Sequence, residues 1–126
     1  MDKLALVGLG GLVGSVLRYL VGGIAQGAES AFPFGTLAVN FTGALGLGLI
    51  MFSSEYLGWF DEPARIFLAI GVMGAYTTVS TFGYESFRLL EQKEDALFLV
   101  NVAGTVILVL FAVYLAKAIV MKFAGA

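Results

Sequence analysis

The sequence predicts an all-α membrane protein, a single domain over residues 1–126 with four transmembrane helices. Hydrophobic residues make up 60% of the chain and charged residues 13%, a composition typical of membrane proteins. Four apolar runs each approach the roughly 20 residues that cross about 30 Å of hydrocarbon. The third run carries four hydroxyl groups between Thr77 and Thr81 and is the least helix-like. We therefore predict a multi-pass protein of the cell membrane with a broken third helix.

The predicted helices span residues 4–24, 36–54, 64–88 and 96–118, with the break in the third near residues 74–81. The first run could instead be a signal peptide, but it exceeds the roughly 7–15 residues of a typical h-region and lacks a convincing basic n-region. A bilayer offers no water to irregular backbone that faces lipid, so a break survives only inside protein or beside a wet cavity. The break is therefore predicted to be functional.

The first predicted helix is rich in glycine and carries one charge. Gly10 and Gly14 have the spacing with which membrane helices pack closely against one another. Arg18 lies near the end of this span. Its long side chain can snorkel to the lipid headgroups or take part in the function, and the sequence leaves both interpretations open.

The second and fourth predicted helices each carry a polar stripe. Thr36 and Asn40 share a face of the second helix with Gly43, and Asn101 and Thr105 are one turn apart in the fourth. An amide inside an apolar span is costly unless it finds partners. Asn40 therefore either links helices or lines a pathway, and both possibilities stay open.

Charged residues follow the predicted break. Thr81, Glu85 and Arg88 share one helical face, because they are spaced four and three residues apart. Glu85 and Arg88 are expected to pair as the helix approaches the membrane surface.

Lysine and arginine are divided almost evenly between the two predicted sides of the membrane. One side holds Lys3, Arg65, Lys117 and Lys122, and the other holds Arg18, Arg88 and Lys93. Because the difference in Lys and Arg sets the orientation, the chain is predicted to insert in both directions and to form an antiparallel homodimer. A single orientation stays open, since one charge can decide it.

The residue types present exclude several classes of function. The chain has no histidine and no cysteine, which removes imidazole bases, thiolate metal sites and disulfides. No nucleophile is paired with a base, so we predict that the protein is not an enzyme. A net charge of −2 without a basic cluster argues against nucleic acid. Ion permeation fits better, because amides and hydroxyls can replace part of a hydration shell, although composition does not choose the sign of the ion.

Several motifs resemble those of the Fluc (CrcB) family of fluoride channels, and the likeness covers essentially the whole chain. They are Gly35-Thr36-Leu37-Ala38-Val39-Asn40 in the second helix, Thr77-Thr78-Val79-Ser80-Thr81-Phe82 with Gly74 and Glu85 in the third, and Arg18 in the first. The resemblance implies a passive and highly selective channel that exports cytoplasmic fluoride. It also implies a dual-topology homodimer with two antiparallel pores.

The resemblance further implies roles for individual residues. Fluoride would meet the amide of Asn40 and the ring edge of Phe82, the positive end of the ring quadrupole. Arg18 would draw anions into a vestibule or brace the fold. Backbone carbonyls of Gly74 and Thr77 from both subunits would hold a structural Na⁺ at the dimer interface. The other polar residues assigned to the pore are Thr36, Ser80, Thr81, Glu85, Asn101 and Thr105.

One departure and three alternatives complete the prediction. Val79 stands where the family usually has a second phenylalanine, so either that aromatic contact is dispensable or this chain conducts differently. A small dual-topology multidrug transporter would need an acidic residue in the first helix, and residues 4–24 contain none. A cation channel and a purely structural membrane subunit stay open as alternatives.

Overall fold

The computed structural model describes residues 2–125, so residues 1 and 126 of the predicted domain lie outside it. The elements are α1 (Lys3–Gln26), α2 (Phe34–Leu57), α3 (Glu62–Arg65), the π-helix η1 (Ile66–Met73), α4 (Gly74–Tyr76), α5 (Val79–Glu91) and α6 (Asp95–Phe123). Four segments of this part of the chain are long and apolar enough to cross a membrane, namely α1, α2, Glu62–Glu91 and α6. The prediction of an all-α protein with four spanning segments is confirmed.

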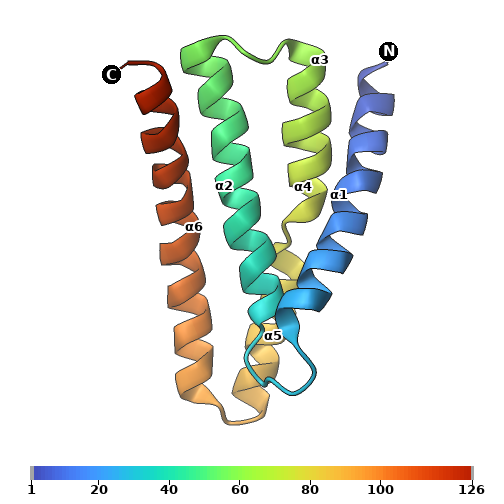
Figure 1. Ribbon diagram of the computed structural model, residues 1–126. Coiled ribbons are helices and arrows are strands. Elements are labelled where there is room, and N and C mark those ends of the chain that lie inside the picture. The colour runs from blue at the N-terminus through green and yellow to red at the C-terminus, as the bar shows by residue number, and fades with distance from the viewer. Residues whose placement is uncertain (1, 126) are drawn as a thin grey trace.

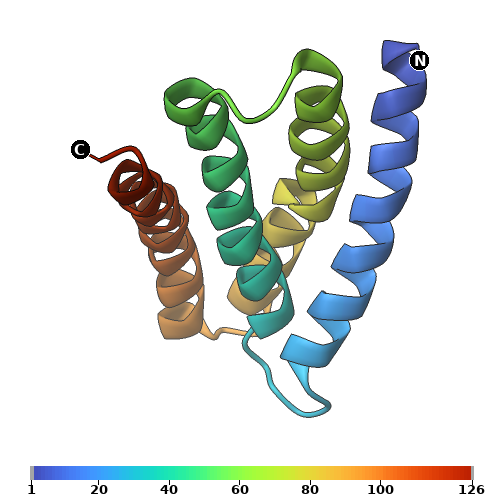
Figure 2. The same cartoon turned by 45° about the horizontal axis from the view of Figure 1, so that its top comes forward.

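The segments form a bundle with both ends of the chain on one side (Figure 1). The α2–α3 connection lies at this same end, and residues 27–33 and 92–94 turn at the opposite end. α1 packs mainly on η1, and α6 packs mainly on α2. Figure 2 shows α1 and α6 as the outer members of the bundle, with α2 and the η1 segment between them. The polar residues predicted for the site are therefore carried mostly by the inner segments.

The third crossing is built from several helical pieces. It begins after Asp61, whose carboxylate accepts the N–H of Ala64 at 2.9 Å. Thr77 (φ −83°, ψ 158°) and Thr78 (φ −150°, ψ 120°) are extended and separate α4 from α5. The Thr78 hydroxyl accepts the N–H of Thr81 at 3.2 Å and caps α5. The direction of α5 is thus set anew after two extended residues.

Close backbone approach holds α1 against η1. A side chain at Gly10 would overlap the Phe67 carbonyl oxygen and lie 2.9 Å from the Gly71 Cα, and one at Gly14 would overlap the Val72 carbonyl. Association of membrane helices depends on such packing, because lipid supplies no hydrophobic force between them. The predicted packing role of Gly10 and Gly14 is confirmed.

Candidate functional site

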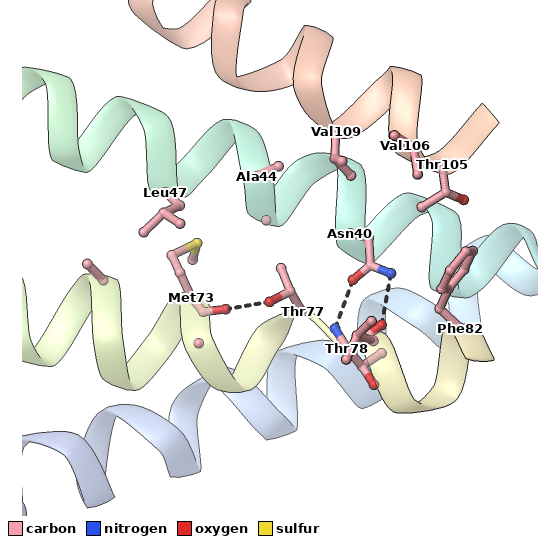
Figure 3. Close-up of a pocket in the computed structure, with 14 residues that line it drawn as sticks. Asn40, Ala44, Leu47, Met73, Thr77, Thr78, Phe82, Thr105, Val106 and Val109 are labelled. Carbon is pink, nitrogen blue, oxygen red and sulfur yellow. Dashed lines mark hydrogen bonds between the residues drawn. The ribbon is translucent and has the colours of Figure 1, made fainter. Parts of the chain in front are cut away.

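Asn40 of α2 holds the extended backbone of Thr78 at two points. Its Oδ1 accepts the Thr78 N–H at 2.8 Å, and its Nδ2 donates to the Thr78 carbonyl at 3.0 Å (Figure 3). The amide is only 8% exposed, so these bonds satisfy a group that would be costly to bury alone. One N–H of Nδ2 is not used by either bond. Asn40 therefore links two helical segments and still keeps a donor.

Asn40 also lines a hollow of about 400 Å³ between α2, the third crossing and α6, which we call the aromatic hollow. Its polar end contains Asn40, Thr78, Phe82 and Thr105, which lie close together in Figure 3. Val79 also lines this hollow and is 81% exposed. The other lining residues are Gly43, Ala44, Leu47, Ala69, Met73, Gly74, Thr77, Val106 and Val109. The structure thus brings Asn40 and Phe82 to one hollow.

Glu85 lies in a second hollow, of about 430 Å³, between α1, α2 and α5. We call it the carboxylate hollow, and Arg18, Thr36 and Thr81 line it too. The Thr36 hydroxyl donates to Glu85 Oε1. The expected pair of Glu85 with Arg88 is wrong, because Arg88 extends along an exposed face to Glu91 at 2.7 Å. Glu85 turns instead to α2.

Arg18 is bound to the third crossing rather than extended toward the lipid headgroups. Its Nε donates to the Ala75 carbonyl at 3.0 Å. That carbonyl lies two residues before the extended Thr77, and an exposed main-chain acceptor inside a membrane needs a partner. The interpretation that Arg18 snorkels to the lipid headgroups is therefore wrong, because its side chain bonds the main chain of the third crossing.

Residues of the interrupted part of the third crossing line a third hollow, of about 460 Å³, together with Arg18. We call it the carbonyl hollow, and Gly74, Thr77 and Ser80 line it. In a continuous helix the N–H groups of Thr78 and Thr81 would bond the carbonyls of Gly74 and Thr77. Here those N–H groups bond Asn40 and the Thr78 hydroxyl instead. Two carbonyl acceptors have therefore lost their helical donors.

The polar stripe of α6 divides between a hollow and the protein interior. Thr105 lines the aromatic hollow, and its hydroxyl donates to Asn101 Oδ1 at 3.4 Å. Asn101 is 2% exposed, lines none of the three hollows, and donates from Nδ2 to Ser86 Oγ at 2.9 Å. Ser80 is exposed, and its hydroxyl lies 3.4 Å from that of Thr78.

Three contributors were not assigned to the site from the sequence. They are the main chain of Thr78, the carbonyl of Ala75 and the hydroxyl of Ser86. A threonine three residues before Thr81 at the start of a helix is a recognisable N-cap signal, so the role of Thr78 could have been found. Nothing in the sequence pattern indicates the other two, because both depend on how α1 and α6 approach the third crossing.

Comparison with known proteins places the chain among relatives that match nearly its whole length. The family described as "CrcB-like protein, Camphor Resistance (CrcB)" matches residues 5–117. A Methanosarcina barkeri protein named "Fluoride-specific ion channel FluC 3" is 50% identical over 121 residues, which cover 96% of this chain and 92% of the relative. "Fluoride-specific ion channel FluC 1" of Methanosarcina acetivorans is 48% identical over 125 residues, 99% of this chain and 95% of the relative. "Fluoride-specific ion channel FluC" of Thermus thermophilus is 41% identical over 116 residues, 91% and 92% of the two chains.

Proposed function

The chain belongs to the CrcB-like family, and on that premise we propose that it is a passive, fluoride-selective ion channel of the cell membrane and not an enzyme. The observation that carries this proposal is its 50% identity, over 96% of its length, to a relative named as a fluoride-specific ion channel. The four membrane-spanning segments support it. In a cell that accumulates fluoride, such a channel lets the ion leave the cytoplasm down its gradient.

The aromatic hollow supplies the chemistry that a small anion needs. The unused N–H of Asn40 is a donor without full charge, and the ring of Phe82, which lines the same hollow, has a positive edge that can face an anion. Conduction requires that binding be strong enough to admit the ion and weak enough to release it, which neutral donors satisfy better than a fixed cation. The hydroxyls of Ser80 and Thr81 are further hydrogen-bond donors. Ser80 lines the carbonyl hollow, and Thr81 lines the carboxylate hollow.

Purified protein in liposomes tests this function directly. Vesicles loaded with potassium fluoride and potassium chloride, with valinomycin present, are expected to release fluoride and to retain chloride. Phe82→Ile is expected to slow fluoride release about tenfold or more, because the isoleucine side chain has no quadrupole. Release of chloride at the same rate, or no release of either ion, would contradict the channel proposal and favour a less selective pore or a structural subunit.

We propose that the functional unit is an antiparallel homodimer with two pores. The near balance of lysine and arginine across the membrane supports insertion in both directions. The exposure of Val79 and of the carbonyl hollow beside it supports a partner on that side of the crossing, since main-chain acceptors do not face lipid.

Added charge tests the dual topology. The double variant Ala28→Lys, Gln92→Lys adds two lysines on the side of residues 27–33 and 92–94. That side then has five lysine and arginine residues, and the side of the two termini has four. We expect this variant to adopt a single orientation, with its C-terminus outside, as reported by phosphatase and fluorescent-protein fusions. Flux should fall, and co-expression with the oppositely biased Glu55→Lys and Ala124→Lys variant should restore it. Flux from either variant alone would contradict an obligate antiparallel dimer.

We also propose a structural Na⁺ at the dimer interface, held by the carbonyls of Gly74 and Thr77 from both subunits. The fit is supported by the loss of their helical donors and by their position at the carbonyl hollow. Hard cations take oxygen ligands of this kind. The neighbouring Ala75 carbonyl is already bound by Arg18 and is not a candidate ligand. The ion would supply positive charge that stabilises the freed carbonyls.

Removal of sodium tests this site. Protein dialysed into N-methyl-D-glucamine chloride is expected to melt at a lower temperature than protein in sodium chloride, and added NaCl should restore the melting temperature. Added KCl at the same ionic strength is the control for screening. An identical melting temperature in all three salts would count against the sodium site without touching the channel proposal.

A further inference from the structure

A chain of hydrogen bonds links α6 to α5 and ends at the main-chain carbonyl of Phe82. The Thr105 hydroxyl donates to Asn101 Oδ1 at 3.4 Å, Asn101 Nδ2 donates to Ser86 Oγ at 2.9 Å, and Ser86 Oγ donates to the Phe82 carbonyl at 2.6 Å. Thr105 and Phe82 both line the aromatic hollow. The chain therefore starts and ends at residues of this hollow and passes through the protein between them.

The direction of every proton in this chain is fixed. Ser86 uses its single proton on the Phe82 carbonyl, so it can only accept from Asn101. The amide of Asn101 must then present Nδ2 to Ser86 and Oδ1 to Thr105. Ser86, Asn101 and Thr105 are 5%, 2% and 7% exposed, so a broken link leaves a buried polar atom without a partner. The chain has one well-defined arrangement.

The orientation of α5 is not fixed by α4, so contacts with other helices have to fix it. Two extended residues precede it, and rotation of a helix by one residue turns a side chain through about 100°. Phe82, Ser86 and Leu89 are spaced four and three residues apart, so they lie on one face of α5. Ser86 and Leu89 are the two buried residues of this helix. A hydroxyl and one apolar side chain therefore hold the face of α5 that carries Phe82, while Glu85 of the same helix is held by Thr36 of α2.

We propose that Ser86 is a positioning residue for Phe82. Its hydroxyl, held by Asn101, fixes the rotation of α5 and keeps the ring of Phe82 at the polar end of the aromatic hollow, beside Asn40. The effect on ion selectivity rests on the proposed channel function, whereas the effect on the ring does not. A serine that bonds the carbonyl four residues before it also bends its helix slightly, which gives the same hydroxyl a second influence on the first turn of α5.

Fluorine NMR tests the position of the ring without any ion flux. 4-Fluorophenylalanine at position 82 is expected to give a single sharp resonance in the otherwise unchanged protein. Ser86→Ala should shift it or split it into several resonances, and Ser86→Thr should restore it, because threonine keeps the hydroxyl. Ser86→Cys is the second loss variant, since a thiol is close in size and a weak hydrogen-bond partner. An unchanged resonance in both Ser86→Ala and Ser86→Cys would overturn the proposal.

Flux measurements on the same variants, without the fluorine label, test the consequence. Ser86→Ala is expected to lower the ratio of fluoride to chloride release about tenfold, and Ser86→Thr should recover it. Ser54→Ala is the matched control, because the Ser54 hydroxyl also donates to a main-chain carbonyl, that of Phe60, at the far end of the molecule. A moved resonance with an unchanged release ratio would show that Phe82 does not select the ion. That outcome overturns the effect on selectivity and leaves the positioning of the ring in place.

Discussion

Replacing Asn40 with aspartate is expected to slow fluoride release at least 100-fold. The carboxylate can still accept the Thr78 N–H, but it cannot donate to the Thr78 carbonyl as Asn40 Nδ2 does. It also places a negative charge at the polar end of the aromatic hollow, where the anion has to bind. A buried acceptor without a donor costs about 1–3 kcal/mol, and a 100-fold loss corresponds to about 2.7 kcal/mol. The first cost lowers the stability of the protein, so the loss of flux has to come from the repulsion between the added negative charge and the anion.

Two further variants separate the causes. Asn40→Leu removes both hydrogen bonds without adding charge, and we expect its loss of flux to be smaller than that of Asn40→Asp. Thr42→Val is the control on the same helix, because the Thr42 hydroxyl bonds Tyr76 Oη at 2.8 Å outside the three hollows. It should conduct at the rate of the unchanged protein. Wild-type flux in Asn40→Asp would show that no anion meets this amide.

The sequence predicts the coarse fold well, because the bilayer imposes strict conditions. Each span must be apolar along its whole length, which makes the four segments visible once the charged residues are marked. Small residues are the remaining signal, since lipid gives helices no hydrophobic reason to associate. Gly10 and Gly14 were therefore recognisable as a contact, although only the structure identifies η1 as the segment they meet.

The contacts that α5 makes with other helices could not be predicted in the same way, because two extended residues precede it. Arithmetic on helical faces is valid within one helix. Of the predicted face of α2, Asn40 and Gly43 line the aromatic hollow, whereas Thr36 lines the carboxylate hollow. The arithmetic says nothing of which neighbour a residue of α5 meets, because the dihedral angles of Thr77 and Thr78 set the new axis. The expected pair of Glu85 with Arg88 is wrong for this reason, since Glu85 meets Thr36 of α2.

The same limit explains the behaviour of the α6 stripe. The sequence places Asn101 and Thr105 on one polar face of α6 and does not distinguish their roles. Asn101 donates to Ser86 and does not line the hollow, whereas Thr105 does line it. Their difference comes from the neighbours that they meet outside α6, which no spacing within α6 contains. The roles of these residues in conduction stay predictions, and the Ser86 variants bear on both.

Replacing Gly14 with alanine is expected to give the largest loss of stability. The added methyl group would overlap the Val72 carbonyl oxygen, lie 2.9 Å from the Val72 carbonyl carbon and lie 3.1 Å from the Ala75 Cβ. Backbone of η1 cannot move aside as a flexible side chain can, so α1 has to separate from the third crossing. Overpacking of this kind typically costs about 1–3 kcal/mol and occasionally more, and we expect the upper end of that range.

Separation of α1 from the third crossing would also disturb the site, because Arg18 of α1 donates to the Ala75 carbonyl. Gly14→Ala is therefore expected to lower both the melting temperature in detergent and the fluoride flux. Gly23→Ala is the matched control, since it is the same substitution on the same helix and meets nothing within 4 Å. Alanine favours a helix over glycine by up to about 1 kcal/mol, so this variant should melt at the same temperature or slightly higher. Equal melting temperatures for the two variants would mean that α1 does not pack on η1 as closely as the structure has it, and the contact of Arg18 with the third crossing would lose its support as well.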